Sequence, residues 1–388
     1  MNKKRVIIIG GGSTGCATAH DLTLRGFEVV VVERGEIASG TTGRCSCFVH
    51  SGARYAVKDQ ESAIECIEEN KILRKIMPPN TMEENDGVFV LLGDDDQTYG
   101  DRFFDGCAEC GISAQEITPQ ELLAIEPNLT KDIRRVAIIP DAIVEAMRFA
   151  LSFAATARVN GAKILRYTEV KEFLLSGNRV TGVRVQDRVT SELYNIEAEL
   201  VVNAGGPWAN KISTLVGVKI PLSLSPGVHI ILGTRLVNYV INRMHMPGSG
   251  DFVAPLGNSS ILGTSSWTAQ DPDYLYIPED HIQQMRDECG TLVPMAKTLP
   301  AKGINAASRP LIAAAGKSER DLSRTFECFD HLDQYDIDGF VTISGGKLAT
   351  ARAMAEKVSD LVCKKMEWDV PCQTRTFPLV SYRRLYTG

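Results

Sequence analysis

The sequence lacks any apolar run long enough to cross a lipid bilayer. The apolar run nearest the N-terminus, Val6 to Ile9, falls far short of the roughly 20 residues that a membrane-spanning helix needs. Basic residues precede this run, as they do in a signal peptide, but glycines follow it at once, and a signal peptide would continue with apolar residues. We therefore expect a cytoplasmic protein with no transmembrane segment.

The chain also lacks basic runs and zinc-type cysteine spacing. Its formal net charge is −6 and no segment is strongly basic, so nucleic acid is not an expected partner. Ten cysteines are scattered along the chain, and the CxxC pair Cys107 and Cys110 has no second pair at zinc spacing. We interpret that pair as part of an amphipathic helix and expect no metal site. Cys45 and Cys47 lie in a loop rich in Gly, Ser and Thr, where packing is the favoured interpretation.

A chain of 388 residues is too long for one simple core, so we expect two lobes. Apolar runs without alternation are typical of strands buried on both faces. Such runs predict strands at Lys4–Ile9, Phe27–Glu33, Leu200–Asn203 and Gly339–Ser344. Helical patterns are found at Thr14–Arg25, Gln60–Ile76, Ala146–Asn160 and Lys347–Lys364.

Residues 221–329 have a different pattern, in which alternating strands dominate and one helix, Glu279–Gly290, interrupts them. This pattern indicates an antiparallel sheet inserted in the α/β lobe. Its expected strands are Val228–Leu232, Asp251–Pro255, Ile261–Thr264 and Thr325–Asp330. We predict a discontinuous dinucleotide-binding domain (1–80, 141–218 and 335–370), a substrate or cap domain (81–140 and 219–334) and a C-terminal tail (371–388).

The segment Gly10–Gly15 reads GxGxxG and stands between a predicted strand and a predicted helix. In this context Gly10 permits the tight turn, Gly12 lets a pyrophosphate approach the backbone, and Gly15 lets helix and strand pack closely. The helix N-terminus offers N–H groups and partial positive charge to phosphates. Glu33 ends the second strand, where its carboxylate can bind ribose hydroxyls, and an acid there argues against a 2′-phosphate.

The fingerprint alone does not separate FAD from NAD, but the rest of the chain favours FAD. An NAD enzyme usually completes a contiguous Rossmann domain, whereas this chain returns to the same lobe at Asn203–Trp208 and at Gly345–Thr350. We expect the second return to place a helix N-terminus near the flavin ring, which gains negative charge on reduction. The expected FAD contacts are Gly10, Gly12, Ser13, Thr14, Gly15, Glu33, Arg34, Thr41, Thr42, Arg44, Ser46, Val170, Ala204, Gly205, Trp208, Gly345, Gly346, Lys347 and Leu348.

On these segments the chain resembles the FAD-dependent glycerol-3-phosphate dehydrogenases, and most of all the catalytic subunit of the anaerobic bacterial enzyme. The resemblance implies an α/β fold: a Rossmann-like FAD-binding domain of the glutathione-reductase/D-amino-acid-oxidase type with an inserted α+β antiparallel-sheet substrate domain. It stops short of the C-terminal iron–sulfur domain that the anaerobic enzyme carries, which we expect to be absent. The matching segments are Ile7–Gly15, Thr42–Val57, Glu61–Asn70, Val201–Trp208, Val240–Arg243, Ile261–Ser265, Arg309–Leu311 and Gly345–Thr350.

The resemblance implies oxidation of sn-glycerol 3-phosphate to dihydroxyacetone phosphate by hydride transfer from C2 to flavin N5. It also implies partner subunits or a quinone as electron acceptor, and through partners a peripheral place at the inner face of the cell membrane. Arginine suits the phosphate because it donates two parallel hydrogen bonds, and the C2 hydroxyl needs a base. The family pattern assigns substrate contacts to His50, Arg54, Tyr55, Arg309 and Arg324, and catalytic roles to His229 as base, with His50 as second candidate, and to Arg309 and Lys347.

The sequence departs from the family pattern on the substrate side. Pro226 stands where relatives often have Lys, Ala307 and Ser308 replace Gly-Val, and Ala351 replaces Tyr. Two alternatives therefore stay open. One is a flavin enzyme for a 2-hydroxy acid or an amino acid, which needs one Arg for a carboxylate. The other is a protein that binds FAD and docks partner subunits without turning over a substrate.

Overall fold

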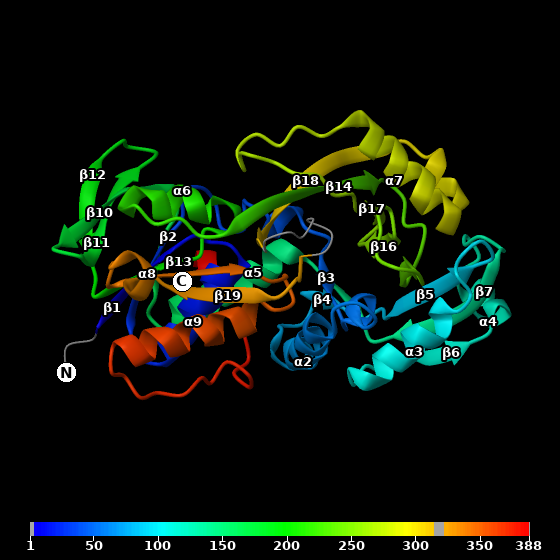
Figure 1. Ribbon diagram of the computed structural model, residues 1–388, viewed down its shortest axis with the longest axis horizontal. Helices are drawn as coiled ribbons and strands as arrows, with labels where there is room; N and C mark the ends of the chain where they lie inside the picture. The colour runs from blue at the N-terminus through cyan, green and yellow to red at the C-terminus, as the bar shows by residue number, and fades with distance from the viewer. Residues whose placement is uncertain (1–3, 314–321, 388) are drawn as a thin grey trace.

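The computed structural model describes residues 4–313 and 322–387, and a six-stranded sheet forms the core of its first lobe (Figure 1). The strand order is β19-β20-β13-β1-β2-β9, and every neighbouring pair is parallel except β19 with β20. The predicted buried strands are confirmed to within two residues. The bounds are β1 Arg5–Ile9, β2 Glu28–Val32, β9 Lys163–Leu165, β13 Leu200–Asn203, β19 Phe326–Asp330 and β20 Phe340–Gly345.

Three helices pack together against this sheet. Helix α1 (Ser13–Leu24) contacts both α5 (Ala146–Val159) and α9 (Ala351–Lys365), and small residues on α1 allow the close approach. The predicted helix at 347–364 was placed too early. Residues 347–350 form turns instead, in which the Thr350 N–H donates to the Lys347 carbonyl oxygen and Thr350 Oγ1 accepts the Lys347 N–H, so α9 begins only at Ala351.

The second lobe contains an eight-stranded sheet in the order β18-β14-β17-β16-β15-β5-β7-β6. Its pairs are antiparallel except β15 with β5, so the predicted antiparallel insertion is largely confirmed. In Figure 1 the long strands β14 and β18 extend from the first lobe into the second. The bounds are β5 Gly87–Leu92, β6 Gln115–Ile117, β7 Ile133–Ile139, β14 Leu222–Leu232, β15 Val240–Arg243, β16 Phe252–Leu256, β17 Ser259–Gly263 and β18 Ala301–Ile312.

The assignment of residues 325–330 to the inserted sheet is wrong. These residues form β19, whose Phe326–Asp330 pair with Gly345–Val341 of β20 in the first lobe. Their short alternation was read as an edge of the second sheet, but it suits an edge of the first equally well. The strand that pairs with β14 at this end of the second sheet is β18, whose bounds were not predicted from the sequence.

Two smaller sheets and a set of helices complete the lobes. The sheet β10-β11-β12 is an antiparallel extension of the first lobe, and β3-β8-β4 lies near the boundary. Strand bounds are β3 Phe48–Val49, β4 Met82–Glu83, β8 Ala142–Val144, β10 Thr168–Ser176, β11 Arg179–Asp187 and β12 Leu193–Glu197. Helix bounds are α2 Gln60–Ile76, α3 Tyr99–Glu109, α4 Pro119–Ile125, α6 Ala209–Ser213, α7 Glu279–Leu292, α8 Leu332–Tyr335 and α10 Arg384–Thr387.

Two kinds of feature are absent from residues 4–313 and 322–387. Within these ranges, none of the helices has both the length and the hydropathy that a membrane span requires. The same residues contain no group of three or more His, Cys, Asp or Glu side chains arranged to hold a metal ion. Cys107 is buried in α3 and Cys110 caps the end of that helix.

Candidate active site

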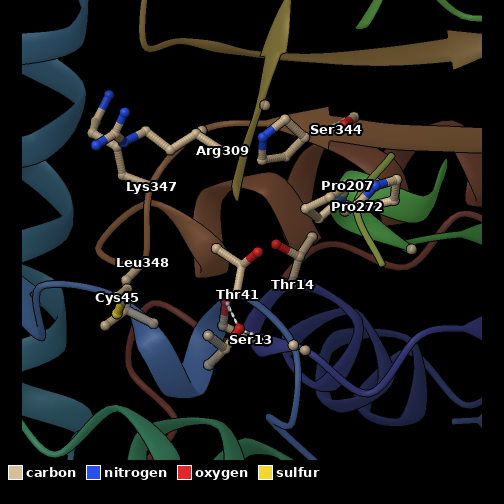
Figure 2. A pocket seen from close by; sticks show the side chains of 18 of the residues that line it. Ser13, Thr14, Thr41, Cys45, Pro207, Pro272, Arg309, Ser344, Lys347 and Leu348 are labelled. Atoms are coloured by element: carbon tan, nitrogen blue, oxygen red, sulfur yellow. Dashed lines mark hydrogen bonds between the residues drawn. The ribbon is translucent and has the colours of Figure 1, made fainter. Parts of the chain in front are cut away.

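A cavity of about 1260 Å³ is lined by residues of both lobes. This volume exceeds the roughly 300–1,000 Å³ of ordinary small-molecule sites, as expected for a cofactor and a substrate in one space. Figure 2 shows Ser13, Thr14 and Thr41 on one side of it and Arg309 with Lys347 on another. The first group belongs to the predicted dinucleotide end, and the second to the predicted substrate end.

At the dinucleotide end the glycines are required by close backbone contacts. Gly10 has φ of +113°, and a Cβ there would lie 2.6 Å from the Ala204 carbonyl oxygen. A Cβ on Gly15 would lie 2.0 Å from the carbonyl oxygen of Gly10, so only glycine lets α1 start this close to β1. Gly15 does not line the cavity itself, and its effect on a ligand is therefore indirect. The first turn of α1 carries no acidic side chain, which leaves its positive end suited to phosphate.

Glu33 is held at the end of β2 by two backbone donors. Its Oε2 accepts the N–H of Gly11 and its Oε1 accepts the N–H of Gly35, both at 2.7 Å. Each carboxylate oxygen retains capacity for a further hydrogen bond, so the group can still accept ribose hydroxyls. The neighbouring Thr42 Oγ1 accepts the N–H of Ser13 at 3.0 Å and fixes the loop against the helix start.

A clasp of four side chains at the dinucleotide end was not predicted from the sequence. Asp273, from the segment after β17 in the second lobe, accepts hydrogen bonds from Trp208 Nε1 (2.7 Å), Arg34 Nη2 (2.8 Å) and Lys211 Nζ (2.6 Å). The Arg34 guanidinium lies 4.8 Å from the Trp208 ring centroid. Burial alone would raise the pKa of Asp273, but these three donors hold it below its ordinary value. The clasp joins the two lobes beside Glu33.

At the substrate end, Lys347 extends from the loop between β20 and α9. Its Nζ donates to the Arg324 carbonyl oxygen at 2.8 Å and lies 5.2 Å from the Tyr55 ring centroid. The carboxylate of Glu65 lies 3.9 Å away. Burial raises the pKa of Glu65 to about 7, so near neutral pH this acid only partly compensates the lysine charge.

Arg309 lies inside β18, opposite Ser225 of β14. Its guanidinium donates to Ser225 Oγ (3.2 Å), Thr264 Oγ1 (3.2 Å) and the Ser265 carbonyl oxygen (3.0 Å). A Cβ on Gly227 would lie 2.2 Å from Arg309 Nη2, so this glycine makes room for the guanidinium. The side chain is thereby fixed in position on the cavity wall.

Arg54 forms a buried ion pair that had no signal in the sequence. It contacts Asp251 Oδ2 and the Gly248 carbonyl oxygen, and Asp251 also accepts the Gly248 N–H at 2.7 Å. His245 Nε2 lies 3.4 Å from the other carboxylate oxygen. Burial opposes ionisation of Asp251, but Arg54 outweighs it and the pKa of Asp251 is well below its ordinary value. Arg54 is thus held in place by an acid at the start of β16.

His50 lines the cavity between these cations. Its ring packs edge-on against Phe48 (4.9 Å between centroids) and Tyr55 (6.0 Å). Burial, then the charges of Arg54 and Lys347, lower the pKa of His50 to about 3. The imidazole is therefore neutral at physiological pH and can accept a proton.

The structure places His229 behind the cavity wall. It is buried in β14 and is not among the cavity-lining residues; its Nε2 lies 3.0 Å from Ser46 Oγ. Burial, with a contribution from Arg309, lowers the pKa of His229 to about 4. Arg324, which precedes β19, does line the cavity, and its backbone N–H donates to Asp59 at 3.1 Å. Of the two predicted base candidates, only His50 therefore reaches the cavity.

The remaining predicted residues converge on the same cavity. Every expected FAD contact lines it except Gly15, and every expected substrate contact lines it. The set comprises Gly10, Gly12, Ser13, Thr14, Glu33, Arg34, Thr41, Thr42, Arg44, Ser46, Val170, Ala204, Gly205, Trp208, Gly345, Gly346, Lys347, Leu348, His50, Arg54, Tyr55, Arg309 and Arg324. The glycine approach, the helix start without acidic residues and the Glu33 carboxylate fit the pyrophosphate and ribose of FAD.

Residues 5–360 match the family described as FAD dependent oxidoreductase, and the chain belongs to that family. It is 40% identical to the A1 chain of the anaerobic glycerol-3-phosphate dehydrogenase of Haloferax volcanii, over 96% of this chain and 66% of that one. It is 38% identical to the corresponding chain of the anaerobic enzyme of Escherichia coli (strain K12), over 96% and 69%. The chain thus spans about two thirds of the length of these relatives.

Solved structures show the same fold at low identity. The glycerol-3-phosphate dehydrogenase of Bacillus halodurans complexed with FAD aligns with a TM-score of 0.73 at 23% identity, over 97% of this chain and 68% of that one. The L-alpha-glycerophosphate oxidase of Mycoplasma pneumoniae with FAD bound aligns with a TM-score of 0.76 at 18% identity, over 98% and 100%. Glycine oxidase from Geobacillus kaustophilus aligns at 0.72 and 18%, over 97% and 99%, so the fold alone does not select a substrate.

Proposed function

We propose that this FAD-dependent oxidoreductase oxidises sn-glycerol 3-phosphate to dihydroxyacetone phosphate. The observation that carries the proposal is the set of cationic side chains around one neutral histidine: Arg54 and Lys347 lie close enough to His50 to lower its pKa, and Arg309 and Arg324 line the same cavity. FAD, when bound, supplies the acceptor for the hydride that leaves C2.

The phosphate is assigned to the arginines. Arg309 is held on the cavity wall by hydrogen bonds to Ser225, Thr264 and Ser265, and a guanidinium matches phosphate oxygens with parallel donors. Arg54 is anchored by Asp251, and Lys347 by the backbone of Arg324. A dianionic phosphate in a partly dry site requires more than one cation nearby. Arg54, Arg309 and Lys347 supply these cations from the cavity wall.

The C2 hydroxyl is assigned to His50. A base must be unprotonated and within hydrogen-bond reach of its proton, and His50 is neutral and lies on the cavity wall. His229 contacts Ser46, and Ser46 lines the cavity. We therefore assign His229 a positioning role that acts through Ser46. A bound phosphate would raise the pKa of His50 toward its ordinary value, which strengthens it as a base.

The electrons leave, in this proposal, to partner subunits or to a quinone. The support comes from the relatives in Haloferax volcanii and Escherichia coli, each of which is named as one subunit of an anaerobic glycerol-3-phosphate dehydrogenase. A peripheral place at the inner face of the cell membrane would then follow from the partners.

The alternatives from the sequence differ in what the cavity must bind. A 2-hydroxy acid or amino acid needs a single arginine for its carboxylate, and glycine oxidases share the fold. A non-catalytic FAD-binding protein needs no cationic wall at all. The several cations around His50 favour a phosphorylated substrate over both.

The deciding experiment is an anaerobic titration of the FAD-loaded protein with glycerol 3-phosphate, followed by visible flavin absorbance. We expect bleaching with glycerol 3-phosphate and much weaker bleaching with glycerol, lactate or glycine at equal concentration. Bleaching by lactate or glycine alone would support the second candidate. No bleaching by any of them, with dithionite still reducing the flavin, would leave the non-catalytic role.

A further inference from the structure

Two cysteines share the cavity wall with the predicted flavin loop. Of the ten cysteines, all in the described ranges, only Cys45 and Cys47 line the cavity. Cys45 packs on the same apolar cluster as Leu348, from the loop after β20, and Figure 2 shows these two side chains in the cavity. Plain packing, the interpretation favoured from the sequence, does not explain why both thiols reach this one wall.

Each sulfur of the pair lies against the backbone of the other cysteine. Cys45 Sγ lies 3.4 Å from the backbone nitrogen of Cys47, and Cys47 Sγ lies 3.5 Å from the carbonyl oxygen of Cys45. Residues i and i+2 are at most about 7 Å apart between Cα atoms, which overlaps the roughly 4.4–6.8 Å that a disulfide spans. Cys47 has φ of +63°, a left-handed conformation that costs free energy in a non-glycine residue and recurs at functional sites.

We propose that Cys45 and Cys47 form a two-electron dithiol–disulfide couple that exchanges electrons with the flavin bound in the same cavity. On oxidation the two S–H bonds break and one S–S bond forms. The two electrons and two protons released reduce the oxidised flavin, and the reverse transfer restores the dithiol. The couple needs bound FAD but does not depend on which substrate the enzyme oxidises.

The electrostatics of the pair are those of a reactive dithiol. Among the ten thiols, only that of Cys45 has a pKa below its ordinary value, chiefly because it accepts a hydrogen bond from Cys47. The pKa of Cys47 is raised by the same interaction and by burial. Disulfide formation and opening proceed through the thiolate of one cysteine, so a thiol with a lowered pKa beside a second thiol favours this exchange. Burial raises the pKa of a cysteine outside the cavity, such as Cys66 in α2, to about 12, so that thiol is inert.

The first test is a reductive titration of the air-oxidised, FAD-loaded protein with dithionite under anaerobic conditions. We expect the wild type to consume about twice the dithionite per flavin that Cys45→Ser or Cys47→Ser consumes, since the couple takes up as many electrons as the flavin. Cys328→Ser, a half-buried thiol on β19, is the control and should titrate as the wild type does.

The second test needs no variant and no turnover. Alkylation of the denatured protein should modify two fewer cysteines after air oxidation of the FAD-loaded form than after its reduction, and peptide mapping should place the difference in the segment with Cys45 and Cys47. Equal dithionite uptake by wild type and variants, or equal alkylation of both forms, would overturn the proposal. Because dithionite replaces substrate, failure of the glycerol 3-phosphate assignment would leave this test unchanged.

Discussion

The two ends of the cavity are built in different ways. At the dinucleotide end, backbone groups and glycines form most of the surface: Gly10 and Gly15 allow contacts of 2.6 Å and 2.0 Å that any Cβ would prevent. At the substrate end, side chains from distant segments converge, with Arg54 and Lys347 separated by about three quarters of the chain. Substitution of a glycine at the dinucleotide end disrupts the backbone contacts directly. At the substrate end, a single side chain can be replaced and substrate preference changed while the backbone stays in place.

The largest effect is expected from a side chain at the helix start. In Gly15→Val the new atoms meet the Gly10 carbonyl, so α1 must shift and FAD affinity should fall by more than about 100-fold. The flavin content of the purified protein measures this. Gly303→Ala is the matched control, because its Cβ would meet only Ile231 Cδ1 at 3.8 Å. Retention of FAD by Gly15→Val would refute the backbone account of this end.

Removal of a cation from the substrate end should affect turnover and spare the cofactor. Arg309→Ala should lower kcat/KM for glycerol 3-phosphate by about 100-fold or more, because it removes charge-assisted hydrogen bonds to the phosphate. Arg309→Lys should recover only part of this, since lysine lacks the planar pair of donors. FAD content should stay unchanged in both.

Arg102→Ala serves as the control for this pair, because Arg102 is an exposed residue that pairs with Asp96. Steady-state kinetics with the substrate concentration varied separate KM from kcat. An Arg309→Ala enzyme as active as the wild type would contradict the phosphate assignment.

A smaller effect is expected from Asp273, the acid of the clasp at the dinucleotide end. Asp273→Asn weakens the bonds to Arg34 and Lys211, and FAD should dissociate about tenfold faster. Release is followed by the rise of flavin fluorescence after dilution. Asp132→Asn is the control, because Asp132 is exposed, pairs with Arg134 and does not line the cavity. Equal release rates in the two variants would show that the clasp does not hold the cofactor.

The smallest effect concerns a buried histidine outside the cavity. His20 of α1 is fully buried beside Phe153 and Phe377, and burial lowers its pKa to about 4. A histidine with a lowered folded pKa favours folding above its unfolded pKa and loses that contribution as the pH falls from about 6.5 toward 4. Between pH 7.5 and 5 this amounts to about 2 kcal/mol.

His20→Phe should therefore flatten the fall in thermal stability over that pH range without changing FAD content. Denaturation followed by circular dichroism at several pH values measures it. An acid-dependence identical to that of the wild type would show that His20 does not titrate on unfolding as assigned.

The dinucleotide end was predicted well from the sequence because its signals are local. Gly10, Gly15 and Glu33 lie within one strand–helix–strand unit, and the periodicity of that unit is visible in the residues themselves. The substrate end was predicted only through resemblance, which named Arg309 and Lys347, both on the cavity wall, and His229, which lies behind it. Residues 325–330 were assigned to the wrong sheet because a short strand does not reveal which sheet it joins.

Two features of the site had no local signal at all. Asp251 and Asp273 are ordinary acids in loops and strand starts of the second lobe, and nothing in their neighbours indicates Arg54 or Trp208 as partners. The Cys45–Cys47 spacing is visible in the sequence. Their redox role depends on both thiols lining the cavity, which the sequence does not indicate.

The sequence by itself therefore determined the dinucleotide fold and the cofactor class, since both depend on glycines and strands adjacent in the chain. The tertiary structure decided which cations surround His50, which groups anchor them, and which thiols reach the cavity. These depend on contacts across hundreds of residues, and the free energy of such contacts comes from burial that no local pattern encodes.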